Sequence, residues 1–311
     1  MSDIISSDPA QKNDIWYKYK TVSVDHLDQL QEDFDRHDRA GSLSDHPTFR
    51  SYLANKKFTL PEDMPNAKSI IVMAVFNPLM LVDFHVNGKP LEVMLPPQYY
   101  DDGVSLEDLE AMIQEDILPE PGYEILCATH LHLKLLAVRS GLGRYGRNNI
   151  CYVDDMGSLL TLYAYFTDYE FEVYDWADIG MMPSCENCQL CYKRCPTQAI
   201  RKENFVVDIG RCVTLYNEIH GEFPDWMPKH THNALMGCMH CQLNCPANRE
   251  PLKRSGRLEA VTQEETDRIL RGDADEALLE ALSRKLRSYY PASSAENFPI
   301  FTRNLGALLL R

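Results

Sequence analysis

The sequence feature that most constrains the fold is a closely spaced set of cysteines, Cys185, Cys188, Cys191 and Cys195, with Pro196 directly after the last. The spacing C-x2-C-x2-C-x3-C-P is typical of bacterial ferredoxins, in which three of these thiolates bind one 4Fe-4S cluster and the fourth binds the other. Four more thiolates are available downstream, from Cys212, Cys238, Cys241 and Cys245. We therefore expect two 4Fe-4S clusters, with no ligand taken from Cys127 or Cys151.

These eight cysteines divide into two ligand sets under the ferredoxin spacing. The first cluster is assigned Cys185, Cys188, Cys191 and Cys245, and the second Cys195, Cys212, Cys238 and Cys241. Zinc sites and disulfides are the other uses to weigh. Zinc sites favour two C-x2-C pairs and do not require a third cysteine followed by C-x3-C-P. Disulfides are rare in a reducing cytoplasm, so both alternatives are disfavoured.

The N-terminal residues and the apolar stretches of the sequence indicate where in the cell the protein is expected. The opening residues MSDIISSDPAQKND contain no apolar signal core, and no twin-arginine pair precedes an apolar run. The longest apolar stretch, residues 69–76, is far too short to span a bilayer. We therefore expect a cytoplasmic protein with no membrane association.

Length and charge limit the function classes. The chain has 311 residues, which allows roughly two domains of typical size. A large domain therefore precedes the cysteines. The formal net charge is -15. Nucleic-acid binding depends on Lys and Arg neutralising phosphates, so this charge makes nucleic acid an unfavourable partner and favours a small-molecule substrate.

Apolar periodicity and turn signals predict the elements around the cysteines. Residues 24–39 repeat apolar side chains every three or four positions, which indicates an amphipathic helix. Residues 69–76 are a continuous β-prone run, typical of a strand buried on both faces. Other predicted elements are a hairpin turning at Asn87-Gly88, a helix capped by Ser105, a helix at 128–140 ended by Gly141, a strand at 159–167, and helices at 258–270, 274–286 and 303–310.

The loop Gly141-Leu-Gly143-Arg-Tyr-Gly146 formally matches the dinucleotide-binding pattern G-x-G-x-x-G. That pattern works when it leaves a strand and opens a helix, whose N-terminus then faces the pyrophosphate. Here the loop leaves a helix and precedes β-prone residues at 150–153, which argues against a dinucleotide. We interpret the glycines as allowing close approach of the backbone to a flat or bulky ligand.

The order of these motifs resembles the epoxyqueuosine reductase family, relatives of the reductive dehalogenases. The resemblance extends from about Leu60 to Asn248. It rests on the strand at 69–76, the loop at 140–148, the strand from Gly157-Ser158 to Asp168, the cysteine run, Arg211-Cys212 and the segment 237–248. The sequence Arg303-Asn304-Leu-Gly-Ala-Leu is also similar to the family's C-terminal helix.

This resemblance implies an α/β (α+β) fold in three parts. They are a nitroreductase-like cobalamin-binding domain at 1–178, a ferredoxin-like double 4Fe-4S domain at 179–250 and a small C-terminal helical segment at 251–311. It also implies base-off cobalamin beside the clusters and a low-potential electron donor such as ferredoxin or flavodoxin. The residues expected to contact the cofactor are Gly141, Gly143, Tyr145, Gly146, Arg147, Asn148, Gly157 and Ser158.

The sequence departs from the family at the expected proton donor. Family members carry an aspartate in a Val-Asp-Thr/Ser-x-Pro segment before the Gly-Leu-Gly loop, and counting back from Gly141 places Cys127 there. An unperturbed thiol is a much weaker acid than a carboxylic acid. We therefore expect Cys127 to shape the pocket while another group protonates the substrate, with Tyr99, Tyr100 and His130 as candidates.

Three functions are consistent with these observations. The leading hypothesis is a cobalamin- and 4Fe-4S-dependent reductase of a small molecule, either by epoxide or other C–O reduction or by reductive dehalogenation. The second is a non-catalytic iron-sulfur or corrinoid electron-transfer protein. The third is a true epoxyqueuosine reductase of tRNA whose proton donor has moved to another residue.

Overall fold

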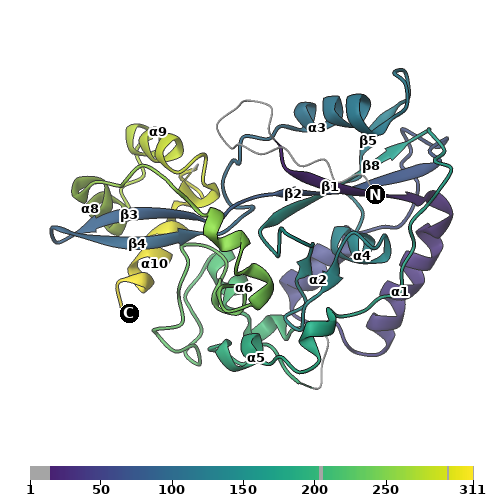
Figure 1. Cartoon of the computed structure of the whole chain (residues 1–311). Coiled ribbons are helices and arrows are strands. Elements are labelled where there is room, and N and C mark those ends of the chain that lie inside the picture. The colour runs from purple at the N-terminus through teal and green to yellow at the C-terminus, as the bar shows by residue number, and fades with distance from the viewer. Residues whose placement is uncertain (1–14, 203–205, 293, 311) are drawn as a thin grey trace. The chain divides into compact units, whose positions relative to one another are not determined.

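The structure, a computed structural model, describes residues 15–202, 206–292 and 294–310. Within them the chain divides into two compact units that alternate along the sequence (Figure 1). Unit 1 holds the described residues of Met1–Phe76, Gly103–Cys188 and Asn204–Val206, and unit 2 holds those of Asn77–Asp102, Gln189–Glu203 and Val207–Arg311. The opening segment 1–14, on which the predicted cytoplasmic location rests, lies outside the described residues.

An antiparallel sheet of four strands forms the centre of unit 1, in the order β1-β2-β8-β5. The strands are β1 (Tyr17–Ser23), β2 (Ser69–Phe76), β8 (Leu160–Thr167) and β5 (Ile125–Cys127). The inner strand β2 is buried from its first residue to its seventh. The predicted strands at 69–76 and 159–167 are therefore confirmed, and the inner position of β2 explains its continuous apolar sequence.

Alternate residues of β2 belong to two different apolar layers, as the two-residue period of a strand requires. The even-numbered apolar residues pack with α1 (Leu27–Arg39) and α4 (Leu133–Arg139). The odd-numbered ones pack with α3 (Leu106–Met112) and the π-helical turn Ile113–Ile117. Figure 1 shows α3 on one side of the sheet and α4 on the other. The sheet of unit 1 is therefore a middle layer covered by helices on both faces.

A buried ion pair joins α1 to α4 inside unit 1. The Asp33 side chain is fully buried, and that of Arg139 is 7% exposed. The Arg139 Nε donates to the Asp33 carboxylate at 2.7 Å, and its Nη1 donates to the Ala177 carbonyl oxygen at 3.0 Å. Arg36 donates to the second Asp33 oxygen at 2.9 Å. Because a buried charge is costly without a partner, these contacts fix α1, α4 and the chain at Ala177 to one another.

The helix α4 begins later than the sequence predicts, at residue 133 in place of 128. Ala128 still donates its backbone N–H to Ala164, which belongs to the neighbouring strand β8. His132 is the N-cap, and its ring nitrogen accepts from the Leu135 N–H at 3.3 Å. Burial, with a smaller effect from Lys134, lowers the pKa of His132 to about 3, so the ring is neutral and able to accept. Gly141 follows the helix with φ +72°, a left-handed conformation that is common at helix C-termini. The prediction that Gly141 ends this helix is therefore confirmed.

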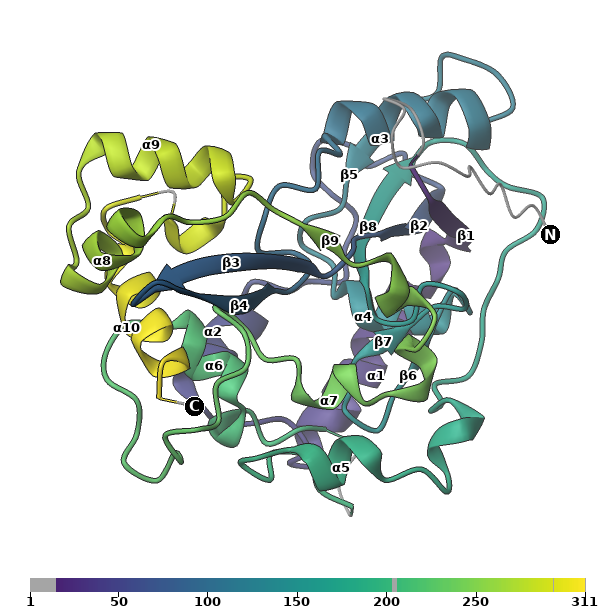
Figure 2. The ribbon, with the colours of Figure 1, turned by 60° about the vertical axis from the view of Figure 1, so that its left-hand side comes forward.

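Unit 2 is built on a three-stranded sheet in the order β4-β3-β9 (Figure 2). The hairpin strands β3 (Met80–Val86) and β4 (Lys89–Leu95) turn at Asn87-Gly88, both at positive φ, as predicted. The short strand β9 (Gly256–Arg257) pairs parallel with β3. Helices α8 (Gln263–Arg271), α9 (Glu276–Lys285) and α10 (Phe298–Leu308) cover this sheet and share one apolar core with it.

Three sequence predictions differ from unit 2. The predicted domain 1–178 contains the hairpin, whereas the structure packs the hairpin with α8–α10, because an isolated two-stranded hairpin has too little buried surface to be stable. The helix predicted at 258–270 starts only at 263, because residues 256–257 pair with β3 and Thr262 forms the capping box with Glu265. The helix predicted at 303–310 already begins at 298.

The remaining elements are short. In unit 1 they are α2 (Pro47–Ala54) and the pair β6 (Arg144–Tyr145) and β7 (Cys151–Tyr152). In unit 2 they are α5 (Leu190–Arg194), α6 (Val213–Glu218) and α7 (His240–Leu243). No helix in the described part of the chain is long and apolar enough to cross a membrane.

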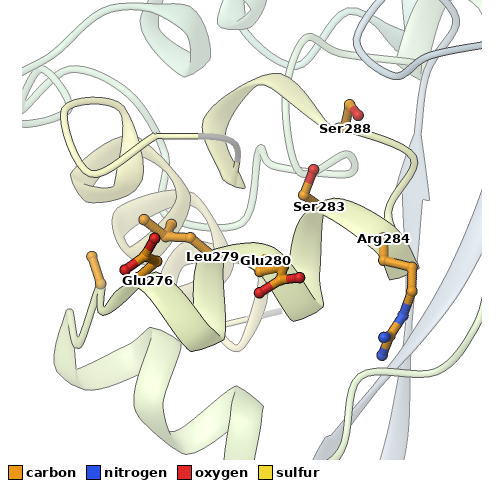
Figure 3. Close-up of a pocket in the computed structure, with 7 residues that line it drawn as sticks. Glu276, Leu279, Glu280, Ser283, Arg284 and Ser288 are labelled. Carbon is orange, nitrogen blue, oxygen red and sulfur yellow. The ribbon is translucent and has the colours of Figure 1, made fainter.

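A shallow hollow of about 770 Å³ lies along α9 in unit 2 (Figure 3). Charged, hydroxyl and aliphatic side chains line it: Ala274, Glu276, Leu279, Glu280, Ser283, Arg284 and Ser288. Its lining includes neither a cysteine nor a histidine, so the hollow has no part in holding the clusters.

The ion pair of unit 1 gives a stability prediction. Asp33→Ala leaves Arg139 buried without its carboxylate, so we expect it to lower the free energy of unfolding by about 3–5 kcal/mol. Glu32→Ala, an exposed position one residue earlier in α1, is the control and should change stability by less than about 0.5 kcal/mol. Urea unfolding followed by circular dichroism measures both. Equal midpoints for the two variants would show that the pair does not hold α1 to α4.

Candidate functional site

The cysteines lie at the ends of very short helices. Cys185 closes the 3-10 helix Pro183–Cys185, Cys212 is the N-cap of α6, and Cys245 is the N-cap of the 3-10 helix Pro246–Asn248. Cys191 lies within α5 and Cys241 within α7. All ten cysteines are free in the structure. Cys185 and Cys188 belong to unit 1 and the other six proposed ligands to unit 2.

Unit 2 brings together three members of the second proposed ligand set. Burial raises the pKa of Cys238 to about 12, with smaller contributions from the neighbouring Cys212 and Cys195. Burial is also the main reason why the pKa of Cys212 is raised, and Cys195 adds to the shift. Helices α5 and α7 pack against each other and carry ligands on both sides of this group. The raised pKa values of Cys212 and Cys238 favour their neutral thiols in the absence of a bound cation.

Hydrogen-bond donors point at the sulfurs of this group. The Cys195 Sγ accepts from the Ala199 N–H at 3.2 Å and lies 3.8 Å from the Thr197 hydroxyl oxygen. Both the backbone N–H and the hydroxyl of Thr214 donate to Cys212. The backbone N–H of His240 donates to Cys238. Donors to sulfur stabilise thiolate and raise the reduction potential of a bound cluster.

None of these donors was predicted from the sequence, although the sequence contains a signal for two of them. Thr197 and Thr214 each follow a ligand cysteine by two positions, in Cys195-Pro-Thr197 and Cys212-Val-Thr214. At that spacing a threonine hydroxyl can turn back to a side chain at the start of the turn.

Helix α10 holds the chain that carries Cys212 and Cys238. The Asn304 Nδ2 donates to the carbonyl oxygens of Asn217 at 2.9 Å and Leu235 at 2.8 Å. The Asn217 Nδ2 in turn donates to the Gly237 carbonyl oxygen at 2.8 Å. Arg303, the preceding residue of α10, donates to the carbonyl oxygens of Tyr216 and Ile219. Both ligand loops are therefore fixed by one helix through buried hydrogen bonds.

The arrangement of the cysteines fits clusters better than single metal ions. Among the described residues, no three side chains of His, Cys, Asp or Glu converge as ligands of one ion. A tetrahedral zinc site needs such convergence, whereas a 4Fe-4S cluster is held by four thiolates around a larger inorganic core. The donor set of Cys195, Cys212 and Cys238, with N–H groups directed at sulfur, suits an iron-sulfur cluster.

Arg147 clamps the first two cysteines of the ferredoxin motif. Its Nη2 donates to the Cys185 carbonyl oxygen at 2.7 Å, and its Nε donates to the Cys188 carbonyl oxygen at 3.3 Å. The strand β6 supports the same segment, because the Met182 N–H donates to the Tyr145 carbonyl oxygen at 2.8 Å. A planar guanidinium can span two carbonyls at once, which a lysine cannot do. All these groups belong to unit 1, so Arg147 fixes the local shape of its Cys-x2-Cys turn.

The glycines of the 141–148 loop have a packing role inside unit 1. A Cβ on Gly143 would lie 2.6 Å from the Cys151 Sγ and 2.8 Å from the Tyr152 carbonyl oxygen. A Cβ on Gly146 would lie 2.6 Å from the Tyr152 ring. The glycines thus let the loop approach β7, which differs from the predicted role of making room for a ligand. A bulky side chain at Gly143 would disturb unit 1 itself.

The other residues predicted to contact the cofactor also have partners within the protein. Tyr145 is buried in the core beside α1 and α4, and the Asn148 Nδ2 donates to the Tyr152 hydroxyl at 2.9 Å. Gly157, at φ +60°, closes a tight turn with Val153, and Ser158 is buried next to it. These contacts hold the loop against the rest of unit 1. They do not test its binding to a corrinoid, which stays a prediction.

Tyr99 and Tyr100, two of the predicted proton donors, lie in unit 2 with their hydroxyls engaged. Tyr99 donates to Glu218, and its ring fills the space beside Gly237. Tyr100 donates to the Asn77 side chain at 2.6 Å and contacts the Pro78 carbonyl oxygen. Burial is the main reason why both pKa values are raised, so both phenols are protonated. Tyr99 packs against Gly237, which directly precedes the ligand Cys238.

Cys127 and His130 lie in unit 1, and the sheet separates their side chains. Cys127 pairs with Tyr165 of the neighbouring strand β8, and both residues belong to the α3 layer. The His130 ring stacks on Phe166, which faces the α1 and α4 layer, and its Nε2 lies 3.0 Å from the Thr59 carbonyl oxygen. The two candidates therefore do not form one catalytic group.

The electrostatics around Cys127 keep its thiol neutral. Burial, and then the nearby Glu110 carboxylate, raise the pKa of the Cys127 thiol, while the neighbouring Tyr165 hydroxyl opposes the shift. Tyr165 is fully buried, and burial followed by Cys127 raises the pKa of its hydroxyl. At neutral pH this group therefore offers proton donors and no thiolate nucleophile.

Residues 184–248 match the family model of a 4Fe-4S double cluster binding domain. Curated relatives carry the name epoxyqueuosine reductase. That of Staphylococcus aureus is 28% identical over 193 residues, covering 60% of this chain and 50% of the relative. That of Escherichia coli is 34% identical over 115 residues, covering 37% of this chain and 29% of the relative. The chain thus matches half or less of the length of these relatives.

Solved structures of epoxyqueuosine reductases share the fold. The Bacillus subtilis structure, with its catalytic aspartate loop swung out of the active site, has a TM-score of 0.64 at 21% identity and covers 94% of this chain and 77% of its own. The Streptococcus thermophilus structure has a TM-score of 0.62 at 19% identity, with 94% and 76% covered. The resemblance inferred from the motifs, the mixed α/β fold and the double 4Fe-4S domain are therefore confirmed.

The ligand assignment predicts the metal content. Anaerobically purified protein should contain about eight irons per chain and negligible zinc. Cys212→Ala removes one buried ligand of the second set and should lower the iron content to about half. Iron and zinc are measured by plasma emission spectrometry. Cys151→Ala is the control, since Cys151 is buried but lies outside both sets. Iron content that matches a single cluster and is unchanged by Cys212→Ala would refute the assignment.

The Arg147 clamp predicts a selective effect on the first cluster. Arg147→Lys keeps the charge but loses the second carbonyl contact, and Arg147→Ala loses both. We expect Arg147→Ala to lower iron content toward about four per chain, with Arg147→Lys between it and the wild type. Electron paramagnetic resonance of the reduced protein should show one cluster signal weakened. Arg144→Ala, at an exposed position of β6, should retain both signals; equal loss in it would point to general instability of the loop.

Proposed function

We propose that this protein is a reductase that uses two 4Fe-4S clusters and cobalamin. The double cluster binding domain at residues 184–248 and the fold shared with epoxyqueuosine reductases support this proposal. The observation that carries it is the contact of Arg147 with Cys185 and Cys188, because one loop then serves both proposed cofactors. Electrons that arrive at the cluster domain would leave it beside the loop at 141–148.

Cobalamin would bind in its base-off form at the 141–148 loop. When bound and reduced, a corrinoid supplies a strong two-electron nucleophile that single low-potential electrons regenerate. The assignment rests on the resemblance to epoxyqueuosine reductases, since the glycines of this loop are used in packing against β7. The exposed members of the loop, Gly141 and Arg144, are the positions where a bound corrinoid would meet the chain directly.

The proposed site differs from the Bacillus subtilis reductase at the catalytic aspartate. Cys127 stands at the corresponding position in the motif order, and burial raises the pKa of its thiol. A neutral thiol can shape a pocket and donate a hydrogen bond, but it is a poor substitute for a carboxylic acid. We propose that Cys127 shapes the pocket and that the substrate takes its proton from another group.

The proposed substrate is a small epoxide or halogenated molecule. The net charge of -15 disfavours a long polyanion, and the missing aspartate argues against the unchanged family reaction. The second candidate is epoxyqueuosine in tRNA. It is favoured by the name of the relatives and by a solved epoxyqueuosine reductase that holds an epoxyqueuosine-modified tRNA stem loop, which has a TM-score of 0.63 at 21% identity and covers 94% of this chain and 76% of its own.

Turnover assays separate these candidates. Protein reconstituted with iron, sulfide and cobalamin should retain the corrinoid, seen in its visible spectrum, and should reduce epoxides or halogenated aromatics with a strong reductant. Cys127→Ala should lower the rate by less than about tenfold, whereas loss of a general acid costs roughly 100-fold or more. Cys127→Ser is the matched control, since it keeps size and a hydrogen-bond donor.

Three results would contradict the proposal. Conversion of epoxyqueuosine to queuosine in tRNA would favour the second candidate. Loss of turnover in Cys127→Ala, with both cofactors retained, would make the thiol a participant. Full cluster loading with neither corrinoid retention nor turnover would indicate an electron-transfer protein.

A further inference from the structure

A compact group of cations lies on the cluster domain of this acidic protein. The chain has a net charge of -15, yet the run from Asn187 to Lys202 contains four cations and no Asp or Glu. We call these four residues the α5 patch; they are Lys193, Arg194, Arg201 and Lys202. All four are exposed, and α5 itself contributes no residue to a buried core. The patch is therefore a local reversal of the protein's overall charge.

Most of the charge of the α5 patch is not neutralised by the protein. Arg201 forms an ion pair with Asp208. Lys193 and Arg194 have no ion-pair partner within the described ranges 15–202, 206–292 and 294–310. Lys202 lies over the Tyr192 ring, with its Nζ 5.6 Å from the ring centre, a contact that keeps the positive charge. A partner can therefore bind the positive charges of Lys193, Arg194 and Lys202 without displacing an internal ion pair.

The position of the patch relates it directly to the cluster ligands. Lys193 and Arg194 lie between Cys191 and Cys195, which the ferredoxin spacing assigns to different clusters. Helix α5, which carries Cys191 of the first set, packs on α7, which carries Cys241 of the second set (Figure 2). Leu190, at the start of α5, is 42% exposed and adds an apolar contact point. Such a mixture of a small apolar point and surrounding charge is typical of transient interfaces.

We propose that the α5 patch is the docking surface for an acidic one-electron carrier protein of the ferredoxin or flavodoxin class. This inference rests on the proposed function, in which the clusters receive electrons from outside. The net negative charge of the chain repels an acidic carrier, and a cationic patch beside the ligands reverses that repulsion where transfer must occur. In each encounter the carrier loses one electron and one oxidised 4Fe-4S cluster gains it, with no other group consumed.

The size of the patch favours a protein partner over RNA. Affinity for RNA depends on the number of phosphates that cations neutralise, and three unpaired cations support only a few such contacts. Electrostatic steering of a transient protein encounter, in contrast, needs only a few charges and can raise association rates roughly 10- to 1,000-fold at low salt. RNA binding by the patch is therefore the alternative that the experiment must distinguish from docking of a carrier protein.

Charge reversal on α5 tests the docking surface. The measurement is the rate of cluster reduction in stopped flow, with a reduced acidic ferredoxin as donor, in the full-length protein with both clusters loaded. We expect Arg194→Glu and Lys193→Glu each to slow reduction about tenfold at low salt, and the difference from wild type to vanish at high salt. Reduced methyl viologen, a small cationic donor, should reduce all variants at least as fast as the wild type.

Arg284→Glu is the matched control. Arg284 is an exposed arginine near the end of α9, as Arg194 is at the end of α5, and α9 carries no cysteine. Figure 2 shows α9 far from α5 within unit 2. Ferredoxin-driven reduction in this variant should match the wild type. Because the measurement follows cluster reduction alone, it gives an answer even if the protein turns over no substrate.

Two results would overturn the proposal. The first is equal ferredoxin-driven rates in Arg194→Glu, Lys193→Glu, Arg284→Glu and the wild type. The second is an Arg194→Glu variant that loses tRNA binding in a gel shift while ferredoxin still reduces its clusters at the wild-type rate. The second result would assign the α5 patch to RNA.

Discussion

The burial of the cysteine thiols is the constraint on which the cluster domain depends. With a pKa of about 12, Cys238 cannot ionise at neutral pH by itself, and Cys212 is shifted in the same direction by burial. Cys195, Cys212 and Cys238 would hold a bound cluster as thiolates, and the cluster would tie the loops that carry them to one another. The donors at Ala199, Thr214 and His240 then favour the charged sulfur. Bound clusters would stabilise these short helices and loops, whereas apolar packing stabilises the sheets and longer helices of the protein.

The two units solve different problems with different interactions. Unit 1 relies on apolar layers over both faces of its sheet and on the Asp33–Arg139 pair. Unit 2 keeps its apolar core around β3 and α8–α10, while a network from Arg303 and Asn304 holds the polar ligand loops. Helix α10, which resembles the family's C-terminal helix, therefore has a structural role. It supports the backbone that carries Cys212 and Cys238.

The sequence predicted features that depend on local patterns. The strand β2, the turn at Asn87-Gly88, the cap at Ser105 and the stop at Gly141 follow from spacing and from the backbone preferences of single residues. The cysteine spacing predicted a double cluster domain for the same reason, because a ligand motif is a short-range pattern. The boundaries of α4 and α8 were less predictable, since a neighbouring strand in each case takes residues that favour a helix.

Features that depend on distant contacts were not accessible from the sequence. The glycines of the 141–148 loop are explained by β7, and the role of Arg147 by two carbonyl oxygens that follow it by about forty residues. Tyr99 and Tyr100 are adjacent in sequence but donate to different partners, and Cys127 and His130 face opposite sides of a sheet. Chemical suitability alone therefore could not show which partners the fold gives to each candidate proton donor.

The interleaving of the two units has a consequence for biosynthesis. The hairpin β3–β4 ends at residue 95, but its apolar partners in α8–α10 begin only at residue 263. At a translation rate of about 5–20 residues per second, the hairpin waits on the order of ten to thirty seconds for that partner. During this interval its apolar face is open to the chaperones that meet nascent chains. Completion of unit 2 is therefore a late event, and stable capture of iron by Cys212 and Cys238 must follow the emergence of α10 from the ribosome.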